Sequence, residues 1–71
     1  MDEQNLYNRI AELRAAKGLS QQQLADAIGV SRKTISTVET SRFTPSVIIA
    51  LQMARFFDVP VEQIFSFDSF R

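Results

Sequence analysis

Residues 20–39, SQQQLADAIGVSRKTISTVE, contain two consecutive helix signatures. Ser20 is a favourable N-cap, and Gln23 three residues later completes a capping box, so a helix is predicted to begin here and to end at Gly29. Only one residue then precedes Ser31, the next favourable N-cap. Two short helices joined so tightly are predicted to cross at a steep angle.

Small and apolar residues in this stretch fit such a crossing. Ala25 is small where two helices must approach closely, and Gly29 supplies the positive φ that a tight turn needs. Val30, Ile35 and Val38 are placed to fill the angle between the helices. The outer face of the second helix is then left to hydrogen-bonding residues, none of them acidic, namely Arg32, Lys33, Ser36, Thr37 and Thr40.

Helical spacing also dominates the flanking sequence, and no convincing strand is expected before residue 65. The pattern predicts an all-α chain with five helices, over about residues 5–17, 21–28, 31–39, 46–57 and a short one from Pro60 to near Phe65. Asn5 is the expected cap of the first helix, and the last six residues lack a helical period. We therefore expect one domain over residues 1–71, with a core fold at 5–65 and a short irregular or extended tail at 66–71.

Composition excludes several classes of site. The 71 residues contain no cysteine and no histidine, so disulfides, thiolate metal sites and the commonest metal ligand and general base are absent. No nucleophile with an adjacent base, phosphate loop or suitably spaced carboxylate pair is visible, so neither an enzyme nor a bound cofactor or metal is expected. The polar, acidic start and the lack of a long apolar run favour a soluble cytoplasmic protein with no membrane partner.

Charge is unevenly distributed along a chain whose formal net charge is zero. The segment from Arg14 to Arg42 carries five basic residues and two acidic ones, whereas the remainder carries three basic and six acidic residues. The local field, and not the net charge, steers a phosphate backbone. The positive middle segment is weak support for a nucleic-acid partner.

The chain resembles the helix-turn-helix regulators of the phage Cro and repressor type, also called the xenobiotic-response-element family. The resemblance covers about residues 5–65 and implies a five-helix, lambda-repressor-like DNA-binding domain, with the second and third helices forming the helix-turn-helix. Its central matches are Ser20, Gln21, Gln22, Gln23, Leu24, Ala25, Gly29, Val30, Ser31, Thr34, Ile35, Ser36 and Glu39.

This resemblance implies roles for individual residues on double-stranded DNA. The expected base readers are Arg32, Lys33 and Thr37, and Arg42 and Gln21 match phosphate contacts. The full set of expected DNA-facing residues is Gln21, Ser31, Arg32, Lys33, Thr34, Ser36, Thr37, Thr40 and Arg42. The chain departs from the family at Thr40 and Ser41, where asparagine and glycine are common, so Ser41 is expected to adopt a left-handed conformation at a cost of about 1 kcal/mol or more.

Other matches imply structural roles and a dimer. Arg14 and Glu39 match a pair that forms an internal salt bridge between the first helix and the recognition helix. Ile48 and the terminal aromatic residues Phe65, Phe67 and Phe70 are expected at a dimer interface, because so short a chain has little core to cover them.

The function expected from these features is a homodimeric repressor that binds a palindromic operator through the major groove. An antitoxin-like or other protein-interaction module on the same fold remains the alternative, because a fold does not determine a function.

Overall fold

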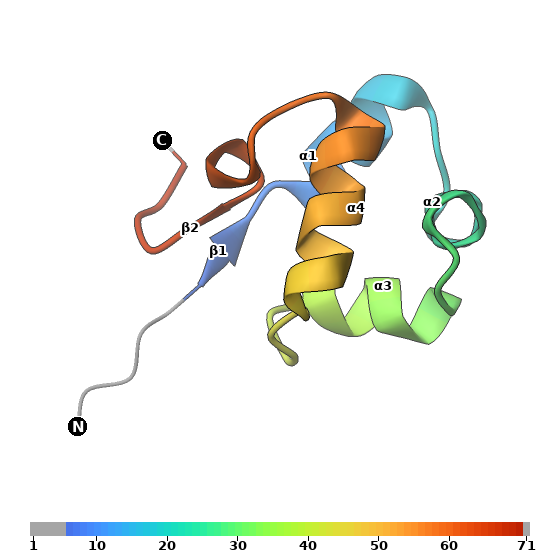
Figure 1. Cartoon of the computed structure of the whole chain (residues 1–71), viewed down its shortest axis with the longest axis horizontal. Coiled ribbons are helices and arrows are strands. Elements are labelled where there is room, and N and C mark those ends of the chain that lie inside the picture. Colours follow the sequence, from blue (N-terminus) through green and yellow to red (C-terminus); the bar gives the residue numbers. More distant parts are fainter. Residues whose placement is uncertain (1–5, 71) are drawn as a thin grey trace.

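Residues 6–70 are described by the computed structural model, in which they form four α-helices, one 3-10 turn and two short strands (Figure 1). In chain order the elements are β1 (Tyr7–Asn8), α1 (Ile10–Lys17), α2 (Gln21–Ile28), α3 (Arg32–Glu39), α4 (Val47–Phe57), the 3-10 turn η1 (Val61–Gln63) and β2 (Phe65–Ser66). In Figure 1, α4 stands upright with its first turn toward α3, while α2 lies on one side of α4 and the two strands lie on the other.

Serine caps set the start of α2, α3 and α4, as predicted. The Ser20 hydroxyl accepts a hydrogen bond from the Gln23 backbone amide at 3.0 Å. The Gln23 side chain accepts one from the Ser20 amide at 2.8 Å, which completes the predicted capping box. Ser31 and Ser46 accept backbone amides in the same way at the starts of α3 and α4. These local signals explain why the predicted limits of the three helices agree with the structure to within one residue.

The beginning of the chain differs from the prediction. Tyr7 and Asn8 form β1, and α1 begins only at Ile10. The Ile10 amide donates a hydrogen bond to Asn8 Oδ1 at 3.1 Å. The predicted cap Asn5 lies outside the described residues. The expectation of an all-α chain without a strand before residue 65 was therefore wrong.

The two strands pair across almost the whole length of the chain. They are antiparallel, with Tyr7 opposite Ser66 and Asn8 opposite Phe65, and the Arg9 amide extends the ladder to the Ile64 carbonyl at 3.0 Å. The predicted fifth helix is correspondingly reduced to the single 3-10 turn η1 after Pro60. Long-range pairing has here overridden the local helical pattern.

The core is a single apolar cluster enclosed by the helices and closed by the strands. It has no buried polar or charged residue within the described part of the chain, and its buried members are Ile10, Leu24, Ala25, Ile28, Ile35, Val38, Met53, Phe57, Ile64 and Phe65. Because α3 contributes only Ile35 and Val38 to this cluster, its remaining residues face outward or toward the rim.

Residues 6–70 lack two further classes of site. None of the helices there has the length and hydrophobicity that a membrane span requires. The same residues do not bring together three side chains of the types that commonly ligate a metal ion.

Candidate nucleic-acid interface

The turn between α2 and α3 is the tight connection that the sequence predicted. Gly29 ends α2 with a φ of 74°, in the left-handed region that side chains disfavour. The Val30 amide donates to the Ala25 carbonyl at 3.0 Å, and Val30 packs against the core cluster, which includes the fully buried Ala25 and Ile35. The turn and its packing therefore fix α3 on α2, with one face inward and the other outward.

Two exposed cations occupy the first turn of α3. Arg32 and Lys33 are exposed, and neither forms an ion pair with any residue of the described chain. The Ser31 hydroxyl accepts the Thr34 amide at 3.1 Å and lies 2.9 Å from the Thr34 hydroxyl, so both side chains stabilise the helix end. With no acidic residue in this turn, the positive end of the helix dipole adds to the two cations, and the surface attracts anions.

The threonine hydroxyls farther along α3 are turned back onto their own helix. Thr37 Oγ1 donates to the Lys33 carbonyl at 3.0 Å, and Thr40 Oγ1 donates to the Ser36 carbonyl at 2.9 Å. Each hydroxyl proton is thus engaged, whereas the oxygen keeps acceptor capacity. Thr37 and Thr40 are therefore placed to accept hydrogen bonds, and Arg32 supplies the outward donors.

A charged network ties α3 to the first two helices. Arg14 Nε lies 2.5 Å and Arg14 Nη2 lies 3.2 Å from the two Glu39 carboxylate oxygens, and Arg14 Nη1 donates to the Leu19 carbonyl at 2.8 Å. The Glu39 side chain is only 8% exposed and that of Arg14 18% exposed. The hydrogen bond to Glu39 raises the pKa of Arg14, and the charge of Glu39 adds to this effect.

Two polar side chains complete this network. Gln21 Nε2 donates to Glu39 Oε1 at 3.1 Å, so its side chain bridges the start of α2 to the end of α3 and is only partly free for a phosphate. Asn8 Nδ2 lies 3.2 Å from the Val38 carbonyl and 3.3 Å from the Glu39 carbonyl, at the C-terminal end of α3. The role of Asn8 was missed, because a local pattern carries no signal for a contact thirty residues away.

The loop after α3 adopts the expected strained conformation. Ser41 has a φ of 62°, which confirms that it occupies the left-handed region where the family commonly has glycine. Its amide donates to the Val38 carbonyl at 3.0 Å, and the Arg42 amide donates to the Thr37 carbonyl at 2.9 Å. This turn holds the Arg42 backbone against the last turn of α3 and leaves the Arg42 side chain exposed.

The residues expected at a dimer interface divide into two groups. Ile48 is 69% exposed and Phe67 is 66% exposed, as an interface role requires. Phe65 instead lies in the core. Phe70 is half-buried, and the guanidinium carbon of Arg9 lies over the Phe70 ring, 5.4 Å from the ring centre. We therefore assign Phe65 to the core. The structure adds Leu51, which is 56% exposed and lies one turn after Ile48 on α4.

Comparisons with known proteins agree with this geometry. A family profile described as helix-turn-helix matches residues 10–64. The uncharacterized HTH-type transcriptional regulator YgzD of Bacillus subtilis is 36% identical over 60 residues, which span 84% of this chain and 91% of that protein. An uncharacterized HTH-type transcriptional regulator of Archaeoglobus fulgidus is 42% identical over 63 residues, which span 89% of this chain and 90% of that protein. The restriction-modification controller protein C.AhdI from Aeromonas hydrophila superimposes with a TM-score of 0.71 at 36% identity, over 78% of this chain and 83% of that one.

Proposed function

The chain belongs to the helix-turn-helix family of DNA-binding transcriptional regulators, and from this membership we propose that it is a homodimeric repressor of a palindromic operator. A bound dimer would repress by covering the operator. We place the protein in the cytoplasm, because duplex DNA lies there in the bacterial and archaeal cells of its relatives.

The observation that carries the proposal is the exposed, cationic first turn of α3, whose Arg32 and Lys33 form no ion pair with residues 6–70. The B-DNA major groove admits a helix, and an arginine there makes bidentate hydrogen bonds to guanine O6 and N7. We propose that Arg32 makes this contact, and that Lys33 binds a neighbouring guanine or phosphate. The hydroxyl oxygens of Thr37 and Ser36 then accept hydrogen bonds from base amino groups, and Thr34 lies near the same bases or the DNA backbone.

Phosphate contacts would position α3 in the groove without selecting the sequence. We assign them to the N-terminal end of α2 at Gln21, to the N-terminal end of α3 at Ser31, and to Thr40 and Arg42 after α3. Supporting this assignment, Arg42 is exposed beside the α3 face, and the free amides at a helix start favour an anion. Gln21 would bind phosphate while its amide also holds Glu39, so it contributes less than Arg42.

A homodimer would bind both half-sites of the operator. Three of the large exposed apolar residues could form its interface: Ile48 and Leu51 lie on α4, and Phe67 directly follows β2. Because the first turn of α4 is toward α3, a two-fold axis along α4 would keep the α3 helices of both subunits on one side (Figure 1). In such dimers the two helices enter successive major grooves about 34 Å apart. Two half-sites also double the phosphate contacts, which specific affinity at physiological salt requires.

Selection of bound duplexes from a random pool, followed by fluorescence anisotropy on the selected sequence, tests the proposal. We expect an inverted repeat with half-sites one helical turn apart and a complex of two chains per duplex. Arg9→Ala is the matched control for Arg32→Ala, because the Arg9 charge is already paired with Glu12 at 2.8 Å. Selection of no sequence, or equal affinity of both variants and the wild type, would contradict the proposal.

A further inference from the structure

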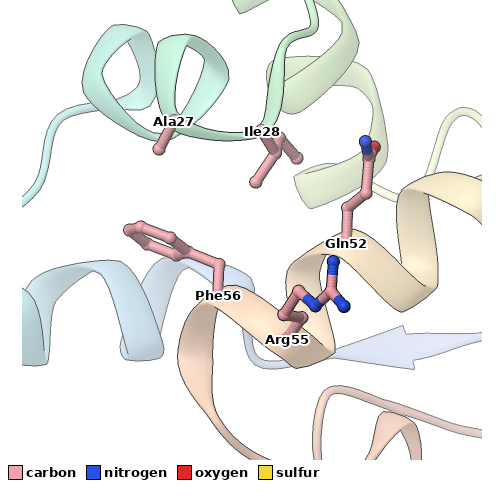
Figure 2. Close-up of a pocket in the computed structure, with 5 residues that line it drawn as sticks. All are labelled: Ala27, Ile28, Gln52, Arg55 and Phe56. Carbon is pink, nitrogen blue, oxygen red and sulfur yellow. The ribbon is translucent and has the colours of Figure 1, made fainter.

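A groove lies between α2 and α4, on the flank of the helix-turn-helix (Figure 2). Its walls are Ala27 and Ile28 from α2 and Gln52, Arg55 and Phe56 from α4, and it has a volume of about 310 Å³. The Phe56 ring and the side chains of Ala27 and Ile28 stand on facing sides in Figure 2, with the two polar side chains along one edge. This α2–α4 groove therefore offers an apolar floor and an edge of hydrogen-bond donors.

Two cationic side chains, Arg55 and Lys17, lie at the α2–α4 groove. Arg55 forms no ion pair with the described residues, and the Lys17 ammonium lies 5.8 Å from the centre of the Phe56 ring. The nearby carboxylate on α2, Asp26, accepts a hydrogen bond from Gln22 at 2.9 Å on its own helix. The groove thus suits an occupant that presents an apolar ring next to a carboxylate.

The chain itself carries a segment with this chemistry. Phe67 is 66% exposed directly after β2, and Asp68 follows it. The Asp68 amide donates to the Ser66 hydroxyl at 2.9 Å, which fixes the backbone of this turn, while its carboxylate forms no ion pair within residues 6–70. Phe67 and Asp68 therefore offer a ring and a carboxylate on consecutive exposed residues of a held turn.

The groove and this turn lie on opposite sides of α4 in one chain. Figure 1 places α2 on one side of α4 and β2 on the other, and the pairing of β2 with β1 holds the start of the turn in place. We propose, on the basis of the homodimer proposed above, that Phe67 and Asp68 of each subunit dock into the α2–α4 groove of the other subunit. The ring lies on the apolar floor, and the carboxylate pairs with Arg55.

Size and symmetry are consistent with this contact. A cavity of about 150 Å³ is enough to hold a benzene ring, so a groove of about 310 Å³ accommodates the Phe67 side chain and part of its turn. In a two-fold dimer each contact occurs twice, because the turn of the first chain meets the groove of the second and the turn of the second chain meets the groove of the first. The exposed side chains of Ile48 and Leu51 on α4 then lie between the two contacts.

Cross-linking tests the contact directly, because the chain has no cysteine of its own. Chains carrying Ala27→Cys and chains carrying Phe67→Cys are mixed and oxidised mildly, and the disulfides are identified by mass spectrometry. We expect the mixed 27-to-67 disulfide to dominate over the two symmetric ones. An Ala16→Cys variant, exposed on α1, is the control and should form no preferred disulfide with Phe67→Cys chains.

Substitutions of the ring and of the charged pair provide the second test, in which sedimentation equilibrium measures dimer dissociation. We expect Phe67→Ala to weaken the dimer at least about 30-fold, because two buried rings are lost. Arg55→Glu and Asp68→Arg should each weaken it, and the double variant should recover most of the affinity. All three substituted positions are exposed, and circular dichroism checks that each variant remains folded.

The outcomes separate this inference from the proposed function. A stable dimer that shows no 27-to-67 disulfide, or that Phe67→Ala leaves unchanged, would overturn the docking contact and leave the dimeric repressor intact. A chain that stays monomeric even on its selected operator would overturn both. A dimer with the mixed disulfide and with recovery in the double variant supports the docking contact.

Discussion

Replacing Glu39 by glutamine tests whether the charged network fixes α3. The carboxylate accepts three hydrogen bonds, two from Arg14 and one from Gln21, and only 8% of its side chain is exposed. Glu39→Gln keeps the shape but removes the charge, and it leaves the guanidinium of Arg14 without its counterion. We expect a loss of about 3 kcal/mol, in the range for breaking a mostly buried ion pair.

This loss is large for so small a domain. A chain of this length has a total free energy of unfolding of about 4 to 11 kcal/mol. With a shift of about 4 to 8 °C per kcal/mol for domains of this size, Glu39→Gln should lower the Tm by about 12 to 24 °C. Thermal and urea unfolding followed by circular dichroism at 222 nm measure both quantities.

The chain supplies a matched control for the same substitution. Glu12 pairs with Arg9 at 2.8 Å, but the Glu12 side chain is 68% exposed, so Glu12→Gln should cost at most about 0.5 kcal/mol. The reasoning would be refuted if Glu39→Gln cost less than about 1 kcal/mol, or no more than Glu12→Gln. A loss of stability in both variants to the same extent would mean that burial of the pair is unimportant.

Three further predictions concern the network, the DNA face and the strained loop. Because the hydrogen bond to Glu39 raises the pKa of Arg14, the stability from this pair is present below the ordinary arginine pKa and is lost only at still higher pH. The stability difference between wild type and Glu39→Gln should thus stay constant from about pH 7 to 10 in urea titrations. Arg32→Ala should reduce the free energy of binding to the operator by about 1 to 3 kcal/mol and relax the base preference. Arg42→Ala should weaken binding to all duplexes and reduce the slope of log affinity against log salt concentration by about one. Fluorescence anisotropy measures both effects. Ser41→Gly should raise the free energy of unfolding by about 0.5 kcal/mol, because the relief of the left-handed strain exceeds the loss of the exposed hydrogen bond from Ser41 Oγ to the Leu6 carbonyl at 3.3 Å. An unchanged urea midpoint would mean that the strain is no larger than the contribution of this hydrogen bond.

Features that depend on adjacent residues could be predicted from the sequence. The serine caps and the Gly29 turn are local chemistry, so the limits of α2, α3 and α4 follow from the side chains near each end. The left-handed conformation of Ser41 followed instead from the family resemblance, because glycine is common in the family at this position. The family resemblance, confirmed by the comparisons, added the Arg14 to Glu39 pair, which no local pattern contains.

Features that depend on distant residues could not be predicted. Tyr7 and Asn8 are extended because Phe65 and Ser66 pair with them, and two residues are too few for an alternating pattern to be visible. The same pairing takes the Phe65 ring into the core, where the sequence placed it at an interface. The contact of Gln21 with Glu39 likewise arises only when two helices meet.

The pairing of β1 with β2 also has a kinetic consequence. It joins Tyr7 to Ser66, so it closes nearly the whole chain into one loop and has a correspondingly large entropic cost of closure. The ladder between such distant partners should form last and fray first, while the more local contacts between α2 and α3 persist. Native-state hydrogen exchange should therefore find the Arg9 amide, which donates to Ile64, opening more readily than the Val30 amide, which donates to Ala25.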